Sequence, residues 1–142
     1  MENEAILLQV RGGDLVGVSE WVYVWLRPGA DRPVVYVGST AVPAVVRIWL
    51  HLHDTDPEVG RMKARYPGIE QDDLDVLAFP VPSRLDRAAV KSALVDRLEA
   101  RGLLSERYVG DQPALLTGNG SVAPAVEWMV GEVIAHNGAA AG

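Results

Sequence analysis

Two tyrosines, an arginine and a histidine lie within thirty residues of one another in this chain. Tyr23 and Tyr36 each occupy a short aromatic and β-branched run, and Arg47 and His51 follow, four residues apart. Residues four apart share one face of a helix, so the Arg47 and His51 side chains are expected to be neighbours. Hydroxyl, guanidinium and imidazole groups can position water, bind phosphate and move protons. The set is therefore a candidate site for anion binding and acid–base chemistry.

A hairpin and a helix must position these residues. Residues 21–27 alternate with a period of two, which predicts a strand with Trp21, Tyr23 and Trp25 on one face. After a Pro/Gly/Asp turn, residues 34–38 form a second predicted strand, with Val34, Tyr36 and Gly38 on one face.

The helix that follows is predicted over residues 44–53, with Ser39 or Thr40 as its cap and Pro43 in its first turn. Its residues are mostly apolar, so we expect it to be buried on most sides. His53 is expected to point away from Arg47 and His51.

These residues resemble the GIY-YIG nuclease superfamily. The first motif is Trp21-Val22-Tyr23, with Trp-Val in place of Gly-Ile, and the second is Tyr36-Val37-Gly38; Arg47 and His51 match the Arg and His of the following helix. The resemblance implies an α/β (α+β) fold: a small, mainly antiparallel sheet of residues 21–27, 34–38 and 73–79, flanked by helices.

The resemblance also implies roles for these residues. Tyr23 and Tyr36 would position and deprotonate a water, Arg47 would bind phosphate, and His51 would assist proton transfer or contact the substrate. Gly38, Trp21 and Trp25 join Arg47 as expected nucleic-acid-binding positions, the tryptophans as stacking platforms if exposed. Each residue also has a structural interpretation: the aromatics and His51 as core, and Arg47 paired with a carboxylate such as Asp75.

Lys91 is where the chain departs from the family pattern. The family holds one divalent metal with a Glu on a late helix, and the best alignment, on Leu94-Val95, places Lys91 at that position. Asp86, Asp96 and Glu99 fall on the opposite side of the predicted helix. No cofactor is therefore assigned from the sequence. Magnesium would be the cofactor if the metal site of the family is retained elsewhere in the chain. Lys91 could supply the positive charge of a metal-free site, or extend its ammonium to solvent from an apolar stem.

Composition limits the remaining possibilities. The chain has 142 residues, no cysteine and a formal charge of −6, which argues against non-specific coating of nucleic acid. Nine of its thirteen basic residues lie between Arg61 and Arg107, together with eight acidic ones, so any basic patch depends on how folding separates them. No apolar run approaches the roughly 18 residues of a membrane span, and the acidic N-terminus does not resemble a signal peptide, so a cytoplasmic location is expected.

The rest of the chain is interpreted as one domain, 1–142, with a family-like core over about 20–104. We expect an extra strand at 5–10, a turn at Gly12-Gly13, and helices at 57–65 and 84–101. A C-terminal extension carries a helix over about 122–135 after a turn at 117–121, and its Gly-Ala-Ala-Ala-Gly end is expected to be disordered.

Two functions remain open from the sequence. The chain is either a GIY-YIG-like nuclease domain acting on DNA or another nucleic acid, with impaired or altered catalysis, or a non-catalytic module that uses the same cleft to bind nucleic acid or a protein partner. A membrane partner is not expected.

Overall fold

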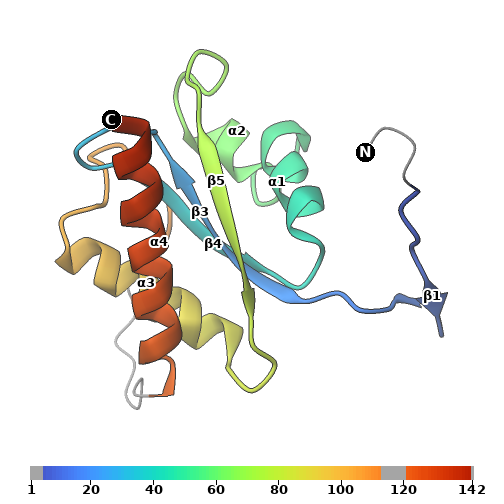
Figure 1. The fold of residues 1–142 in the computed structure, drawn as a ribbon. Helices are drawn as coiled ribbons and strands as arrows, with labels where there is room; N and C mark the ends of the chain where they lie inside the picture. Colours follow the sequence, from blue (N-terminus) through green and yellow to red (C-terminus); the bar gives the residue numbers. More distant parts are fainter. Residues whose placement is uncertain (1–4, 113–120, 142) are drawn as a thin grey trace.

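A three-stranded antiparallel sheet lies between two pairs of helices (Figure 1). The computed structural model describes residues 5–112 and 121–141. The sheet has the order β4-β3-β5. The elements of this body are β3 (Glu20–Leu26), β4 (Val34–Thr40), α1 (Ala44–His53), α2 (Arg61–Arg65), β5 (Asp75–Val81), α3 (Arg87–Ala100) and α4 (Ala123–Ala141). The expected α+β fold, a small antiparallel sheet flanked by helices, is confirmed.

The two faces of the sheet carry different cores. Val22, Val24 and Leu26 face α3 and α4 and form an aliphatic core with residues such as Leu94 and Met129. Tyr23, Trp25 and Tyr36 face α1 and α2 in a smaller, aromatic-rich core with Met62 and Tyr66. Strand alternation explains this division, and it places both motif tyrosines on the same face.

A bulge near the start of β4 changes one prediction. Trp25 pairs with Tyr36 while Leu26 pairs with Val34, so Val35 is an extra residue in the ladder. Val34 consequently packs in the aliphatic core, opposite Tyr36, and the expectation that they share a face is wrong.

Helix α1 has the predicted bounds but not the predicted surroundings. Its N-cap is Pro43 and no side chain caps it; the Thr40 hydroxyl instead accepts from the Val42 N–H. Val45 and Trp49 are 76% and 58% exposed, so the helix is not buried on most sides. It packs on the sheet through one face, which includes His51.

The other helices follow their local signals with changed lengths. Asp56 accepts from the Glu58 N–H, but only a turn follows it, and α2 begins at Arg61. Asp86 caps α3 by accepting from the Ala89 N–H, and Gly102 follows with a φ of 70°. This left-handed conformation favours glycine and ends the helix.

Helix α4 continues to Ala141. The expected disorder of the C-terminal Gly/Ala stretch is therefore wrong for the residues up to Ala141. Alanine is the best helix former, which favours continuation. Side-chain contacts also hold this end: His136 contacts Asp75, and Asn137 hydrogen-bonds to Gly29 and Ala30. Most of the turn expected at 117–121 lies outside the described residues.

Residues 5–18 form an arm that stands clear of the body (Figure 1). The expected strand over 5–10 is wrong; the arm instead pairs β1 (Val10–Arg11) with β2 (Asp14–Leu15) across the predicted Gly12-Gly13 turn. Ile6, Leu7 and Leu8 are 86%, 78% and 72% exposed. None of the helices in the described part of the chain has the length and apolar character that a membrane span requires.

Candidate functional site

The two motif tyrosines meet on the α1 side of the sheet. Their rings stack with centroids 6.3 Å apart, and their side chains are 1% and 2% exposed. Gly38 pairs with Tyr23 across the ladder, and a Cβ at Gly38 would lie 2.5 Å from the Tyr23 hydroxyl. The glycine of the second motif therefore makes room for the tyrosine of the first.

His51 completes this cluster from α1. Its Nε2 lies 2.7 Å from the Tyr23 hydroxyl, and its ring meets Tyr36 edge-on at 5.0 Å between centroids. The side chain is fully buried. Burial, and then the positive charges of Arg47, Arg61 and Arg65, lower the pKa of His51 to about 3. The imidazole is therefore neutral at physiological pH.

Two buried nitrogens beside this cluster lack partners within the described residues: His51 Nδ1 and Trp25 Nε1. Trp25 also meets the His51 ring edge-on, at 5.6 Å between centroids. The tautomer of His51 decides whether Nδ1 is a donor or an acceptor. If the Tyr23 hydroxyl donates to Nε2, the proton of the neutral ring lies on Nδ1.

The environment of Tyr23 keeps its hydroxyl protonated. Burial, and then the nearby Tyr36, raise the pKa of Tyr23, and the positive charges of Arg47 and Arg61 offset this only in part. A neutral phenol beside a neutral imidazole can orient a water by hydrogen bonding. Neither group is poised to remove a proton from it at neutral pH.

Arg47 lies at the edge of this cluster and is half-buried. Its Nη1 donates to the Val59 carbonyl at 2.8 Å, which ties α1 to the turn before α2. The alternative partner considered from the sequence, Asp75, instead contacts His136 at 2.8 Å. The pairing of Arg47 with Asp75 is therefore wrong. No carboxylate within the described residues forms an ion pair with Arg47.

Arg61, which the sequence analysis did not single out, contacts the second tyrosine. Its Nη1 donates to the Tyr36 hydroxyl at 3.2 Å, and its Nε donates to the Glu58 carbonyl. The hydrogen bond to Tyr36 raises the pKa of Arg61. The signal available in the sequence was the cluster of Arg61, Lys63 and Arg65 just after α1.

Lys91 forms an ion pair with a residue far along the chain. Its Nζ lies 2.8 Å from Asp111 Oδ2, and the two side chains are 19% and 61% exposed. The hydrogen bond and charge of Lys91 lower the pKa of Asp111, and Arg61 and Arg65 lower it further. Asp111 thus lies in the field of cations from both α2 and α3.

A short segment, Ser105–Gln112, brings Asp111 to this position, and we call it the strap. It follows the outer edge of β4: the Ser105 N–H donates to the Val34 carbonyl and the Val109 N–H to the Val35 carbonyl. The Tyr108 hydroxyl donates to the Asp111 carbonyl at 2.7 Å. Burial raises the pKa of Tyr108, and the nearby charge of Asp111 raises it further. The strap therefore lies between the Tyr36 side of the cluster and Lys91.

The residues present do not fit the divalent metal that the family resemblance implies. Lys91 stands where the carboxylate ligand was expected, and the nearest carboxylate, Asp111, is engaged by its ammonium. Within residues 5–112 and 121–141, no group of three or more His, Asp or Glu side chains could hold a metal ion. A cation at this position repels a second one.

The two tryptophans expected at the nucleic-acid surface differ in environment. Trp25 is 2% exposed and belongs to the aromatic core, so it offers no stacking surface here. Trp21 is half-buried. His53 points away from the cluster as expected, and its ring lies against Trp49 at 4.5 Å between centroids.

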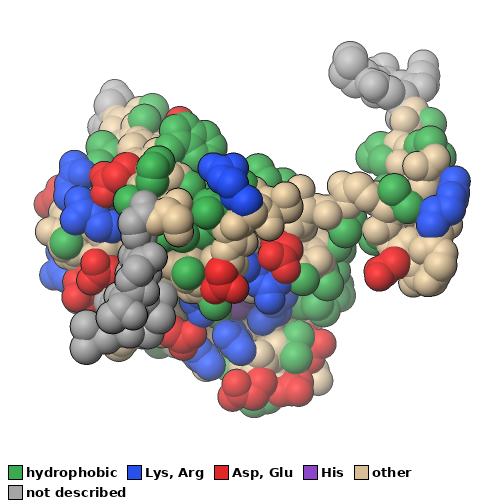
Figure 2. All heavy atoms as spheres, turned by 90° about the horizontal axis from the view of Figure 1, so that it is seen from below, with side chains coloured by type: hydrophobic (Ala, Val, Ile, Leu, Met, Phe, Trp, Pro, Cys, Tyr) green, Lys and Arg blue, Asp and Glu red, His purple; other side chains and the backbone are tan. Residues whose placement is uncertain are grey.

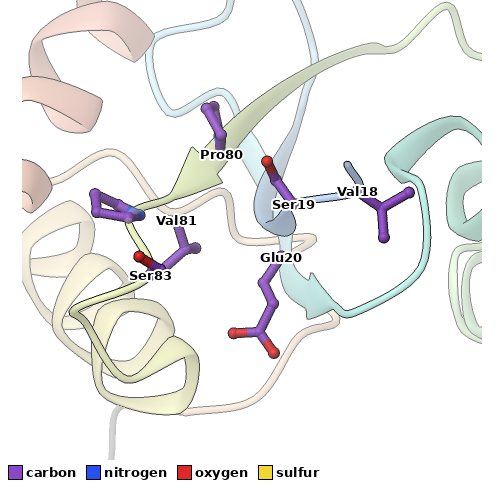
Figure 3. Close-up of a pocket in the computed structure, with 7 residues that line it drawn as sticks. Val18, Ser19, Glu20, Pro80, Val81 and Ser83 are labelled. Atoms are coloured by element: carbon purple, nitrogen blue, oxygen red, sulfur yellow. The ribbon is translucent and has the colours of Figure 1, made fainter. Parts of the chain in front are cut away.

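On the face shown in Figure 2, Lys and Arg side chains are interspersed with Asp and Glu side chains. A separate hollow of about 520 Å³ lies between the chain entering β3 and the end of β5 (Figure 3). Its only charged lining residue is Glu20, which forms an ion pair with Arg87 at 3.2 Å. This hollow does not include any of the candidate residues.

Comparisons with known proteins were made for the whole chain. No family model, curated protein or solved structure matches it. Function is therefore inferred from the geometry of the site and from the motif resemblance.

Proposed function

We propose that this chain is a GIY-YIG-like nuclease domain that engages nucleic-acid phosphodiesters and in which metal-dependent cleavage is impaired. The observation that carries the proposal is the convergence of Tyr23, Tyr36 and His51 in one cluster, at 2.7 Å between Tyr23 Oη and His51 Nε2. Arg47 and Arg61 border the cluster and supply the positive charge that phosphate requires.

The proposed roles follow from the protonation states. Arg47 and Arg61 bind the phosphate oxygens, and the Tyr23 and Tyr36 hydroxyls form hydrogen bonds beside them. His51 orients the Tyr23 hydroxyl. Its low pKa makes it a weak base, and the raised pKa of Tyr23 opposes ionisation of the phenol, so binding is better supported than turnover.

Lys91 supports the same distinction between binding and cleavage. Its ammonium is on α3, on the other face of the sheet from the cluster, and forms an ion pair with Asp111; a cation there cannot act as a ligand for the metal that would polarise the phosphate and stabilise the leaving oxygen. Native protein should therefore bind DNA and show little magnesium-dependent nicking of a plasmid.

Fluorescence anisotropy with a labelled DNA duplex, titrated over a range of salt concentrations, tests the binding. Arg47→Ala should weaken binding and reduce the salt dependence by about one phosphate contact. Arg101→Ala is the matched control, because Arg101 is exposed at the end of α3. Equal affinities for the two variants would contradict the assignment of Arg47, and thermal melts of both would exclude misfolding.

A second candidate function, binding a protein, is favoured by exposed apolar side chains. Val45 and Trp49 on α1 and Ile6 to Leu8 on the arm are all more than half exposed. Contiguous exposed apolar surface is typical of protein interaction sites. Absence of DNA binding at low salt, with an intact fold, would leave this function as the one to pursue.

A further inference from the structure

The cations that surround Asp111 come from two helices on opposite faces of the sheet. Lys91 is on α3 and contacts the carboxylate directly, at 2.8 Å. Arg61 and Arg65 are on α2 and lie close enough to act on the Asp111 charge. Such a convergence of cations favours binding of an anion. The anions present are side chains of the same chain: Asp111 beside Lys91, and Glu58, which lies 3.9 Å from Arg65.

Asp111 reaches this position because the strap follows the edge of β4. Its backbone is held by β4 through Ser105 and Val109, and its end is held by the Tyr108 hydroxyl and by Lys91. The middle of the strap is held as well, because Arg107 forms an ion pair with Asp72 at 3.2 Å and donates to the Pro67 carbonyl. The Asp111 side chain is 61% exposed, so its ion pair with Lys91 is open to solvent. Solvent-exposed ion pairs are weak, which allows a stronger anion to replace this one.

The strap also contacts the aromatic core, against which its Val109 packs. Tyr23 and Tyr36 are 1% and 2% exposed, and the Tyr36 hydroxyl is engaged by Arg61. A phosphate that approaches from solvent therefore meets the cations of α2 and α3 before it meets either tyrosine. In the structure the Asp111 carboxylate lies beside these cations.

We propose that Lys91, Arg61 and Arg65 form an anion-binding site for phosphate groups, and that the Asp111 carboxylate occupies it as an internal competitor. This inference rests on the proposed function, because it describes how a phosphodiester enters the same cleft. A phosphate displaces Asp111 from Lys91, and the strap moves away from the cluster. The acidic side chain thus lowers the affinity of the closed protein for nucleic acid.

Four proteins test the site: the native chain, Asp111→Asn, Asp96→Asn, and Asp111→Asn combined with Lys91→Gln. Asp111→Asn removes the competing charge and keeps the size of the side chain. Asp96→Asn makes the same change in net charge on α3 but about 140° around the helix from Lys91, and Asp96 is exposed. The combined variant removes the proposed cation as well as the competitor.

Two probes are used: a fluorescein-labelled DNA duplex followed by anisotropy, and inorganic pyrophosphate followed by calorimetry, both at low salt. Asp111→Asn should bind both probes up to about fivefold more tightly than native protein, the range expected for one exposed ion pair. Asp96→Asn should stay within about twofold of native protein, and the combined variant should lose the gain.

The outcomes separate this inference from the proposed function. If native protein binds DNA and both single variants bind it equally well, the inference is overturned and the proposed function stands. If Asp111→Asn binds pyrophosphate more tightly but none of the proteins binds DNA, the anion site stands and the proposed function is overturned. If none of the four proteins binds either probe, both are overturned.

Discussion

Acidification should destabilise this protein through His51. The imidazole is fully buried, and burial together with Arg47, Arg61 and Arg65 lowers its pKa to about 3, from an ordinary value of 6.5. The His51 imidazole therefore binds a proton below about pH 6.5 in the unfolded chain, but only near pH 3 in the folded chain. The stability from the neutral buried ring is fully present above pH 6.5 and is lost progressively as the pH falls through this window.

The size of the effect follows from the two pKa values. Each pH unit well inside the window is worth about 1.4 kcal/mol, so lowering the pH from about 7 to about 5 should cost about 2 kcal/mol. This is an upper value, because solvent that reaches the arginine side of the cluster screens the charge. Most carboxylates stay ionised over this range, and the lowered pKa values of Asp72 and Asp111 lie below it.

Urea unfolding at several pH values measures this dependence. Native protein and His53→Gln should lose stability in parallel, because His53 is exposed, while His51→Gln should show a much flatter profile. The histidine ring signals in NMR spectra provide a second readout if His51→Gln does not fold: the His51 signal should not titrate down to pH 5. A normal titration of His51 near pH 6.5 in the folded protein would refute the reasoning.

Two further predictions concern the packing and charge of the site. Gly38→Ala should destabilise the protein by about 1–3 kcal/mol, because the new Cβ would lie 2.5 Å from the buried Tyr23 ring. The control variant Gly131→Ala has open space around it in α4 and should be neutral or stabilising by up to about 1 kcal/mol. Equal effects of the two variants in urea unfolding would contradict the steric argument. Lys91→Glu should lower the melting temperature, because it replaces the ion pair with Asp111 by a like-charge contact. Manganese should raise the melting temperature of this variant but not of native protein. If manganese leaves the melting temperature of Lys91→Glu unchanged, the two carboxylates cannot share a metal ion.

The sequence predicted the sheet well because its signals are local. Alternation in β3 placed Trp21, Tyr23 and Trp25 on one face, and the α1 bounds followed from the apolar run after Pro43. The bulge at Val35 could not be predicted, because an extra residue in a ladder depends on the partner strand and leaves no local signal. The burial of α1 was overestimated for a related reason. Apolar residues show what a helix can bury, and the packing partners decide which of them are buried.

The candidate site was predicted in part. The structure brings Tyr23, Tyr36 and His51 together, and Arg47 lies beside them. The contacts of Arg61 and Asp111 could not be predicted, because they connect residues 25 and 20 positions apart through loops whose paths depend on the whole fold. The sequence singled out Lys91 by its place on the predicted helix. Its partner was not visible.

An NMR titration of the labelled protein with a short DNA duplex at low salt tests the central claim most directly. The claim is that nucleic-acid phosphate binds where β4, α2 and the start of α3 meet. The account predicts that the largest shifts occur at the backbone amides of Gly38, Arg61 and Lys91, and that amides of α4 such as Gly131 change little. No shifts at low salt, or shifts confined to α4 and the arm, would contradict it.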